Sequence, residues 1–283
     1  MGQALYKTQR QVKSMATVKV GQKQRALLRS VPSTYEKSLS HYFGNGIIDV
    51  EQARIQHAAY ANALRGAGVE VTIIDGNEDH PDCIFVEDQA IVIEGKALLP
   101  IPGHESRVGE QLEIAKFLEE QLTKDNLTTM NPPAKMDGGD LLRFGDRFYV
   151  GSSGRTNQEG IVELRQFIES LGYHLTEVDI PENALHLTSI SSTPSDQIIL
   201  APEGFLPKDV FDPLPKGSEV LWMPKEEVYG CNTIGFADGT VLVAKGYPTV
   251  ERTLRERGFN VVLLEMSQIR AADGSLTCCS IFY

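Results

Sequence analysis

Hydrophobic and polar positions recur in one order along the chain: an apolar strand, a tight turn that contains glycine, a second apolar strand, a polar loop, an amphipathic helix, a glycine and a third strand. The clearest copy covers residues 138–180, where the turn Gly145-Asp146 separates two strand-like runs and predicts a hairpin. Apolar residues then recur at helical spacing, and Gly172 stands where the helix is expected to end. The apolar helix positions are Ile161, Leu164, Phe167, Ile168 and Leu171.

Two other stretches repeat the whole order. Residues 231–266 place Asp238-Gly239 at the turn and Gly258 at the end of the helix. Residues 88–122 place Glu94-Gly95 at the turn. The helix of this second stretch is expected to present one apolar face, formed by Val108, Leu112, Ala115, Leu118 and Leu122.

Two more copies are partial. Residues 50–75 match the second half of the unit, with Gly68 between a helix and a strand. A degraded copy lies around residues 196–211, and there prolines replace the helix with a loop. These prolines are Pro202, Pro207, Pro213 and Pro215. Five copies in 283 residues give a period of about 57 residues, near the size of a propeller blade or a similar unit.

Units of this kind bury their strands against one another and place their helices outside. The sequence therefore predicts an α/β fold in which five ββαβ-type units close around a central channel, with loops converging at one end. A doubly wound α/β sheet is the rival interpretation, but it would alternate single strands with helices, whereas hairpins dominate this sequence. We expect one domain over residues 21–283, preceded by a basic, partly disordered arm over residues 1–20.

Composition and charge narrow the classes of function. A hydrophobic share of 41% and a charged share of 23% are typical of a soluble globular protein. The formal net charge of −11 argues against nucleic-acid binding and is compatible with a cationic small molecule as partner. No stretch approaches the roughly 18 consecutive apolar residues of a membrane span. We expect a cytoplasmic protein whose four cysteines are reduced, because their spacing fits neither a disulfide framework nor a zinc site.

Carboxylates interrupt the apolar pattern at two places. In "PDCIFVEDQA", Asp82, Glu87 and Asp88 flank a strand-like run, where burial is costly unless the acids are solvated or paired with a cation. A strand with polar ends is an equally good interpretation of this stretch. In "MDGGDLL", the two glycines permit unusual backbone angles that would aim Asp137 inward, although a simple turn requires nothing more.

Two arginines stand at equivalent places in successive units. Arg107 and Arg155 each lie in a loop near the start of a predicted helix, so both side chains can face the mouth of the channel. The guanidinium fork fits a carboxylate, and the pair would form a clamp for one. A solvated surface position is the commoner outcome for any single arginine.

The remaining candidates are a histidine and two cysteines. His186 stands between leucines in what looks like an apolar strand, where most histidines are core residues rather than catalysts. Cys278 and Cys279 are expected to point to opposite faces of an alternating strand, which gives one reactive and one structural thiol. Together with a histidine and carboxylates, such a thiol supplies the parts of cysteine-based nucleophilic catalysis.

These segments, in this order, resemble the dimethylarginine dimethylaminohydrolases, a family of guanidino-group-modifying enzymes related to arginine deiminases and glycine amidinotransferases. The matching pieces are "PDCIFVED", "SR", "DGGDLL", "VGSSGRTNQEG", "LHLTS" and "DGSLTCCS". They span most of the chain, and their joint occurrence is specific where each alone is weak. The family's fold is the five-bladed α/β propeller called a pentein, which agrees with the repeat described above.

The resemblance implies a role for each matching residue. Cys278 would be the nucleophile, His186 the general acid/base and Asp137 the carboxylate that orients it. Asp82 and Asp88 would pair with the substrate guanidinium, and Glu87 would support the lid side of the site. Arg107 and Arg155 would hold the substrate α-carboxylate, and a backbone carbonyl in the first loop would bind the α-amino group.

The activity implied is hydrolysis of Nω-methylated L-arginines to L-citrulline and dimethylamine or methylamine, through a covalent adduct on the cysteine. No metal or organic cofactor is expected, and zinc bound by Cys278 and His186 would inhibit. Two alternatives stay open: hydrolysis of arginine or another guanidino acid by the same chemistry, and a propeller that only binds. The sequence leaves a homodimer open.

Overall fold

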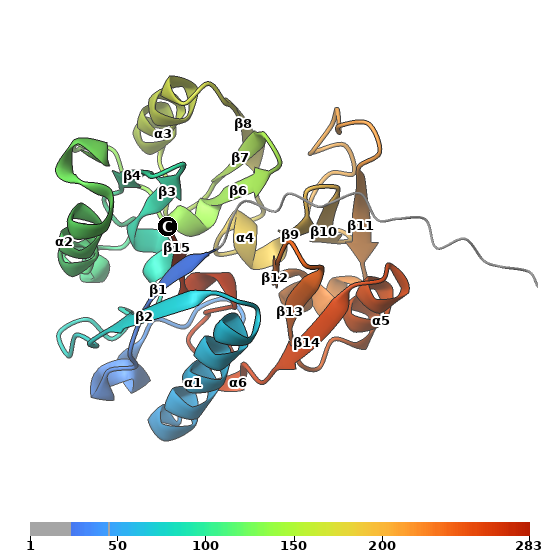
Figure 1. Cartoon of the computed structure of the whole chain (residues 1–283), viewed down its shortest axis with the longest axis horizontal. Helices are drawn as coiled ribbons and strands as arrows, with labels where there is room; N and C mark the ends of the chain where they lie inside the picture. The colour runs from blue at the N-terminus through green and yellow to red at the C-terminus, as the bar shows by residue number, and fades with distance from the viewer. Residues whose placement is uncertain (1–23, 45) are drawn as a thin grey trace, which may run out of the picture.

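The computed structural model of the chain describes residues 24–44 and 46–283, so the expected arm and its boundary at residue 20 lie outside the described residues. Five three-stranded sheets stand around a common axis, and the long helices lie on the outside (Figure 1). Each sheet, here called a blade, combines one antiparallel pair with one parallel pair. The predicted α/β propeller of five units is thus confirmed.

The blades have these bounds. The first contains β1 (Arg25–Arg29), β2 (Glu70–Ile74), β15 (Ile281–Phe282) and α1 (Val50–Gly66). The second contains β3 (Ile91–Ile93), β4 (Lys96–Leu99), β5 (Leu127–Thr129) and α2 (Gln111–Leu122). The third contains β6 (Leu141–Phe144), β7 (Arg147–Ser152), β8 (His174–Asp179) and α3 (Gln158–Ser170). The fourth contains β9 (Ser192–Ser195), β10 (Ile198–Pro202) and β11 (Glu219–Met223). The fifth contains β12 (Thr233–Gly235), β13 (Thr240–Ala244), β14 (Asn260–Leu264) and α5 (Pro248–Glu256). Two short helices, α4 (Leu187–Ile190) and α6 (Ser267–Arg270), lie between blades.

The hairpin turns and the helix ends predicted from the sequence are found in the structure. The three predicted turns join the antiparallel pairs β3–β4, β6–β7 and β12–β13. The helices α1, α3 and α5 are each followed by a glycine in the left-handed conformation, with φ of +84° to +87°, which costs other residues steric strain. In the fourth blade β10 and β11 are joined without a helix, so the proline-rich copy is confirmed as degraded.

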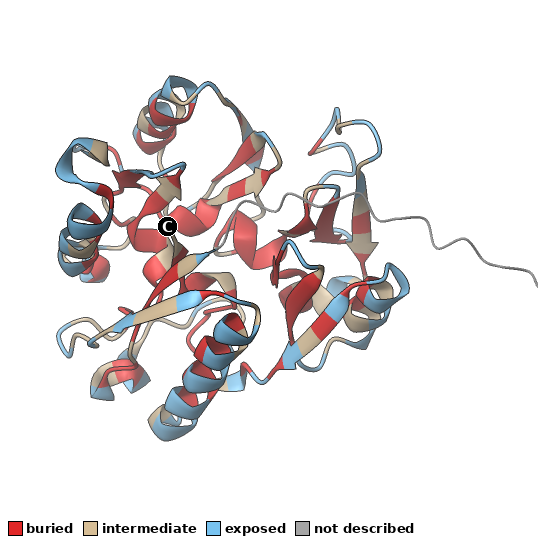
Figure 2. Cartoon of the chain, viewed as in Figure 1, coloured by how far each residue is buried: buried red, intermediate tan, exposed pale blue. Residues whose placement is uncertain are grey.

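Successive residues of a strand pack into two different hydrophobic clusters, one on each face. This alternation holds the ring together. Leu27 packs toward the second blade, whereas its neighbours Ala26 and Leu28 pack toward the fifth. Ile199 and Leu200 divide in the same way between clusters shared with the third and fifth blades. Each of the five clusters therefore joins two adjacent blades, which explains why the strands are apolar on both faces. Figure 2 shows the buried residues concentrated around the axis and the exposed ones on the outer helices.

The last strand closes the ring. β15 pairs antiparallel with β1, with Ile281 opposite Leu27 and Phe282 opposite Ala26. The terminal residues "SIFY" therefore complete the first blade. Among the helices in the described part of the chain, none is long and apolar enough to cross a membrane.

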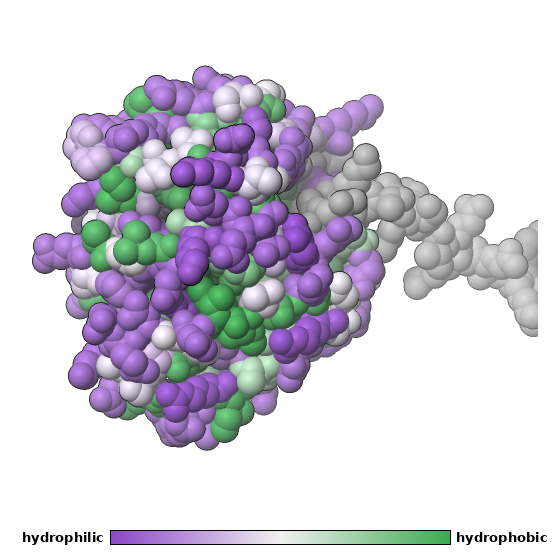
Figure 3. Space-filling model, turned by 60° about the vertical axis from the view of Figure 1, so that its left-hand side comes forward, coloured by the Kyte–Doolittle hydropathy of each residue, from purple (hydrophilic) through white to green (hydrophobic). Residues whose placement is uncertain are grey.

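One predicted helix face is partly wrong, since Ala115, Leu118 and Leu122 pack inward but Val108 and Leu112 do not. Val108 and Leu112 are 52% and 69% exposed, because Val108 precedes α2 and the helix turns Ile114 inward with Leu118 and Leu122. Burying the larger Ile114 instead of Ala115 removes more apolar surface from water, and this decides the orientation. On the face in Figure 3, hydrophilic side chains predominate and hydrophobic ones form small separate patches.

Candidate active site

In every blade a short helical turn precedes the edge strand of the antiparallel pair. These turns are Val86–Gln89, Gly138–Asp140, α4, Lys225–Cys231 and Thr277–Cys279. The fivefold repeat therefore brings segments from distant parts of the sequence to one place. Most of the candidate residues lie on or beside these turns.

The strands predicted around the candidates are wrong. The run "CIFV" forms a turn that leads into Val86–Gln89, His186 is the residue before α4, and the two cysteines lie in the 3-10 turn Thr277–Cys279. Runs of four apolar residues do not distinguish a strand from a buried turn. The turns leave backbone N–H groups available to the buried carboxylates, which a strand paired on both sides would not.

Asp137 is fully buried and holds two cationic side chains. Its Oδ2 accepts from Nε2 of His186 and from Nη1 of Arg155, both at 3.1 Å, and its Oδ1 accepts from the backbone N–H of Gly103 at 2.8 Å. Burial raises the pKa of Asp137, but His186 and the two arginines outweigh this and hold the pKa well below its usual range. Asp137 is therefore ionised throughout the neutral range.

His186 is 1% exposed and surrounded by carboxylates. Burial lowers its pKa, but the negative charges of Asp88, Asp140 and Asp137 outweigh burial and raise it to about 9. Its Nδ1 lies 3.9 Å from Oδ1 of Asp88 and has no hydrogen-bond partner in the described part of the chain. At neutral pH the ring is an imidazolium, a group able to donate a proton.

The two glycines of "DGGD" serve close packing rather than unusual backbone angles, because neither has a positive φ. A Cβ at Gly139 would lie 2.7 Å from Nδ1 of His186, and one at Gly138 would lie 2.1 Å from the carbonyl oxygen of Glu87. The N–H of Gly139 also donates to Oδ1 of Asp88 at 3.0 Å. Any side chain here would separate Asp88 from His186.

Arg107 is buried and surrounded by protein acceptors. Its Nη1 donates to Asp88 at 2.6 Å, its Nε and Nη2 donate to Glu110 at 2.8–3.2 Å, and Nη2 also donates to the carbonyl oxygen of Phe85 at 3.0 Å. Arg107 thus fixes the orientation of Asp88. To bind a substrate carboxylate in this arrangement, Arg107 would have to give up one of these hydrogen-bond acceptors. Arg155 has only Asp137 as a side-chain partner in the described residues.

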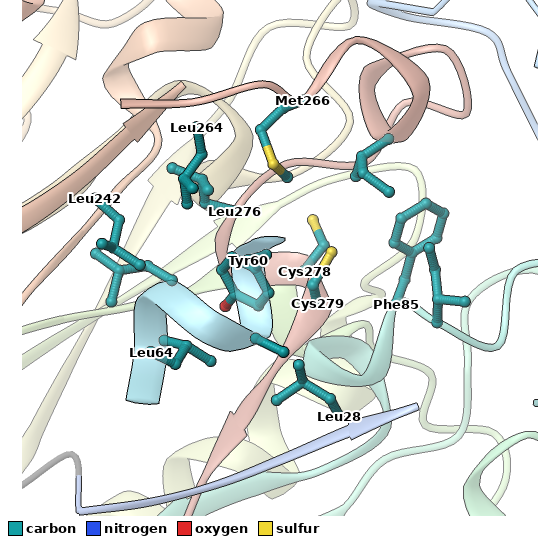
Figure 4. Packing of buried hydrophobic residues seen from close by; sticks show 14 of the residues in the cluster. Leu28, Tyr60, Leu64, Phe85, Leu242, Leu264, Met266, Leu276, Cys278 and Cys279 are labelled. Carbon is teal, nitrogen blue, oxygen red and sulfur yellow. The ribbon is translucent and has the colours of Figure 1, made fainter. Parts of the chain in front are cut away.

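Cys278 is 4% exposed, and its Sγ lies 3.2 Å from Oγ of Ser275. Burial raises the pKa of the Cys278 thiol well above its usual value, and the negative charges of Glu87 and Asp88 raise it further. Cys279 is fully buried, and its Sγ donates to the carbonyl oxygen of Ser275. Figure 4 shows both cysteines on one turn among Phe85, Leu276 and other apolar side chains. Without a bound cation, Cys278 is a thiol.

Glu87 contacts the turn that carries Cys278. Its Oε2 accepts from Oγ1 of Thr277 at 2.8 Å, and it does not border the cavity that Cys278 and His186 line. Burial and the neighbouring Asp88 raise the pKa of Glu87 to about 7. Glu87 therefore supports the turn that carries Cys278, and its expected place on a lid side stays a prediction.

A small cavity joins the remaining candidates. Its volume of about 20 Å³ accommodates roughly one water molecule. Asp82 lies at its wall, accepts from the N–H of Leu39 at 3.1 Å, and has a pKa raised by burial. The lining residues are Leu39, Asp82, Phe85, Asp88, Arg107, Arg155, Leu185, His186, Ala272, Asp273, Gly274 and Cys278.

Sequence reasoning missed three buried acids near this cavity: Glu110, Asp140 and Asp273. Glu110 follows Arg107 by three residues, a spacing that could have identified the ion pair. Asp88, Asp137 and His186 also place ligand atoms within 4.8 Å of one another. Both carboxylates already accept from cationic groups, so the three form an acid–base cluster rather than a prepared metal site.

Comparison with known proteins supports one family. The sequence model described as eukaryotic N,N dimethylarginine dimethylhydrolase matches residues 41–281. The N(G),N(G)-dimethylarginine dimethylaminohydrolase of Pseudomonas aeruginosa is 30% identical over 233 residues, with 82% of this chain and 89% of that protein covered. The enzyme of the same name from Streptomyces coelicolor is 30% identical over 244 residues, with 83% and 90% covered.

Solved structures agree. The Pseudomonas enzyme in complex with citrulline superimposes with a TM-score of 0.83 at 27% identity and covers 92% of this chain and 99% of that one. The N-terminal domain of the cyanobacterial arginine dihydrolase ArgZ superimposes with a TM-score of 0.81 at 16% identity, with 91% and 96% covered. At that identity the second likeness concerns the fold alone.

Proposed function

This chain belongs to the dimethylarginine dimethylaminohydrolase family and is an enzyme of the amidine hydrolase class, and from this premise we propose that it converts Nω-methylated L-arginines to L-citrulline and a methylamine. The reaction proceeds through a covalent thiouronium adduct on Cys278. His186 acts as general acid and then as general base, and Asp137 orients it.

The observation that carries the proposal is the state of the two reactive groups. The carboxylates around His186 raise its pKa, so the imidazole is protonated at neutral pH, whereas burial, and then the charges of Glu87 and Asp88, raise the pKa of the Cys278 thiol, so the thiol is not ionised. A cysteine in such a site becomes a nucleophile only when a cation binds beside it. A guanidinium supplies that cation and is also the electrophile, so the site activates its thiol only when the substrate is present.

Attack on the guanidinium forms the first intermediate. Asp88, ordered by Arg107 and by the N–H of Gly139, holds the bound guanidinium and polarises it. When the guanidinium binds, the thiol releases its proton to solvent. The sulfur forms a bond to the central carbon, and the electron pair of the carbon–nitrogen double bond moves onto nitrogen. The bond from that carbon to the methylated nitrogen then breaks as the imidazolium of His186 gives its proton to the departing amine.

Hydrolysis of the adduct completes the cycle. The neutral imidazole of His186 takes a proton from water, and the resulting hydroxide attacks the thiouronium carbon. The carbon–sulfur bond breaks, the hydroxyl proton passes to the departing sulfur and restores the thiol, and the carbon becomes the urea carbonyl of citrulline. Asp137 stabilises the imidazolium that forms and fixes the ring through the 3.1 Å hydrogen bond at Nε2.

The residues that bind the α-carboxylate and the α-ammonium group of the substrate are assigned by their charge. Arg155 borders the cavity and takes the α-carboxylate, with Arg107 as a second partner if it releases one of its own carboxylates. Asp82 adds a second negative charge at the cavity wall. The two acids Asp82 and Asp88 thus face a substrate with two cationic groups, the guanidinium and the α-ammonium.

The test is a citrulline-release assay on arginine and on its monomethylated and dimethylated forms. Release from the methylated forms is expected, and it is abolished by Cys278→Ser. Cys279→Ser is the matched control, because it removes the neighbouring thiol and should retain most of the activity. Release from arginine alone would favour a deiminase, and full activity of the Cys278 variant would overturn the assignment of the nucleophile.

A further inference from the structure

Asn232 makes hydrogen bonds to both turns that carry the proposed reactive groups. It lies just before β12 and is 1% exposed. Its Nδ2 donates to the carbonyl oxygen of Thr188 at 2.8 Å, and Thr188 lies in α4, two residues after His186. Its Oδ1 accepts from the N–H of Thr277 at 3.1 Å, and Thr277 is the residue before Cys278. One side chain therefore joins segments that lie 44 and 45 residues away on either side in the sequence.

The two partners of Asn232 require an amide. The carbonyl oxygen of Thr188 needs a donor, whereas the N–H of Thr277 needs an acceptor. The second proton on Nδ2 goes to Oγ1 of Thr277 at 2.9 Å, so both donors of the amide are used. A carboxylate of the same shape would only accept, and an apolar side chain would leave buried polar groups without partners.

Hydrogen bonds extend this bridge into a closed circuit around the axis. Oγ1 of Thr277 accepts from the amide and donates to Oε2 of Glu87 at 2.8 Å. In the opposite direction, Oγ1 of Thr188 donates to the carbonyl oxygen of Gly139 at 2.8 Å. The N–H of Gly139 donates to Asp88, which follows Glu87 in the chain. The circuit thus touches a turn or its neighbouring residue in each of the five blades.

Within this circuit Asn232 provides the short connection between the two reactive groups. In the described residues, no direct hydrogen bond joins α4 to the turn Thr277–Cys279, and the other route passes through the turns of two further blades. Cys278 and His186 line the same cavity, whereas Asn232 does not border it. Asn232 therefore affects how these groups lie relative to each other without touching a bound molecule.

The proposed reaction depends on that relative placement. The sulfur attacks the central carbon of the guanidinium while the imidazolium gives a proton to a nitrogen on the same carbon. A misplacement of about 1 Å in such an arrangement can reduce the rate by about 100-fold. Two groups on separate blades can meet this tolerance only if something fixes the distance between their turns.

We propose that Asn232 is a positioning residue that sets the separation between His186 and Cys278. It holds α4 through the carbonyl oxygen of Thr188 and holds the turn of the nucleophile through the N–H of Thr277. The catalytic consequence rests on the proposed function, whereas the hold on the two turns does not.

The first test is Asn232→Ala, which removes the amide and leaves the cavity lining unchanged. We expect kcat for citrulline release to fall by about 100-fold, with KM nearly unchanged because no substrate-binding residue is altered. Asn260→Ala is the matched control, because Asn260 lies in the same blade, is exposed, and donates only to Oγ1 of Thr240. A kcat per folded enzyme equal to that of the control would overturn the proposal, as would a rise in KM as large as the loss in kcat.

The isosteric variant Asn232→Asp adds a readout that loss of stability alone does not produce, and it serves if the alanine variant does not fold. Its carboxyl still supplies a donor when protonated but only acceptors when ionised. Its kcat, divided by that of Asn260→Asp, should therefore fall as the pH rises. The titrations of His186, Cys278 and Glu87 are common to both proteins and cancel in this ratio. A ratio of one at every pH would contradict the bridge.

A third readout needs no substrate. Alkylation of Cys278 by iodoacetamide, followed by peptide mass spectrometry, should be about tenfold faster in Asn232→Ala than in the unmodified protein or in Asn260→Ala, because the turn has lost the acceptor of its N–H. An unchanged rate in a folded Asn232→Ala protein would show that Asn232 does not hold this turn. Absence of citrulline release by the unmodified protein from every substrate would instead overturn the proposed function, and alkylation would still decide whether the hold exists.

Discussion

The hydrogen bond between Asp137 and His186 makes a quantitative prediction about the pH dependence of the reaction. Asp137→Asn preserves the shape of the side chain and its bond to the N–H of Gly103, but it removes the charge that Nε2 of His186 contacts at 3.1 Å. A hydrogen bond to a charged group contributes about 1.5–3 kcal/mol. At about 1.4 kcal/mol per pKa unit, its loss should lower the pKa of His186 from about 9 to roughly 7–8.

The assay is the pH profile of kcat/KM for citrulline release. His186 must be protonated to release the amine, so activity should decline above pH 9 in the unmodified enzyme and about 1–2 units lower in the variant. NMR titration of the imidazole in a Cys278→Ser background reports the same pKa directly. Asp146→Asn removes an equal charge from an exposed turn of the third blade and should leave the profile unchanged. An unaltered high-pH limb in Asp137→Asn would refute the coupling of these two residues.

Three other outcomes are expected from the same structure. Arg155→Ala should raise KM by about 10- to 100-fold through loss of the α-carboxylate partner, with kcat changed less, and an unchanged KM would remove Arg155 from the binding site. Glu87 has a pKa of about 7 in the folded protein, against 4.5 for an ordinary glutamate, so the folded state favours the protonated carboxyl. Its contribution to the free energy of unfolding is present below pH 4.5 and is lost as the pH rises through 7. Glu87→Gln should therefore increase the free energy of unfolding by about 1–2 kcal/mol at pH 8 and hardly at pH 4.5, as measured by urea denaturation; equal effects at both pH values would contradict the raised pKa. Deleting Ser280–Tyr283 removes β15 and should abolish both the cooperative thermal transition and activity, whereas a shortened chain that keeps both would show that ring closure is dispensable.

The parts of the fold that could be predicted are those set by local chemistry. Glycine and aspartate at Gly145-Asp146 specify a hairpin, and Gly172 ends a helix, whatever the rest of the chain does. The face of α2 could not be predicted, because the choice between Ile114 and Ala115 depends on the neighbouring blade.

At the candidate site, residue types were more informative than local conformation. Cys278, His186 and Asp137 do lie around one cavity or touch its lining, but neither Cys278 nor His186 lies on the strand that was predicted for it. Asp273 escaped notice for a different reason: its partners are backbone N–H groups, and these carry no signature in the sequence. The pairing of Arg107 with two acids depends on Asp88, which only the folded ring brings into place.

The pairing of β15 with β1 has a consequence for the order of events during synthesis. β1 is made first among the described strands and β15 last, so the first blade waits for its third strand while the other four emerge complete. Cys278 lies three residues before that strand. A nascent chain can therefore assemble most of its acid–base cluster before it carries Cys278, and it buries that thiol at the step that pairs β15 with β1.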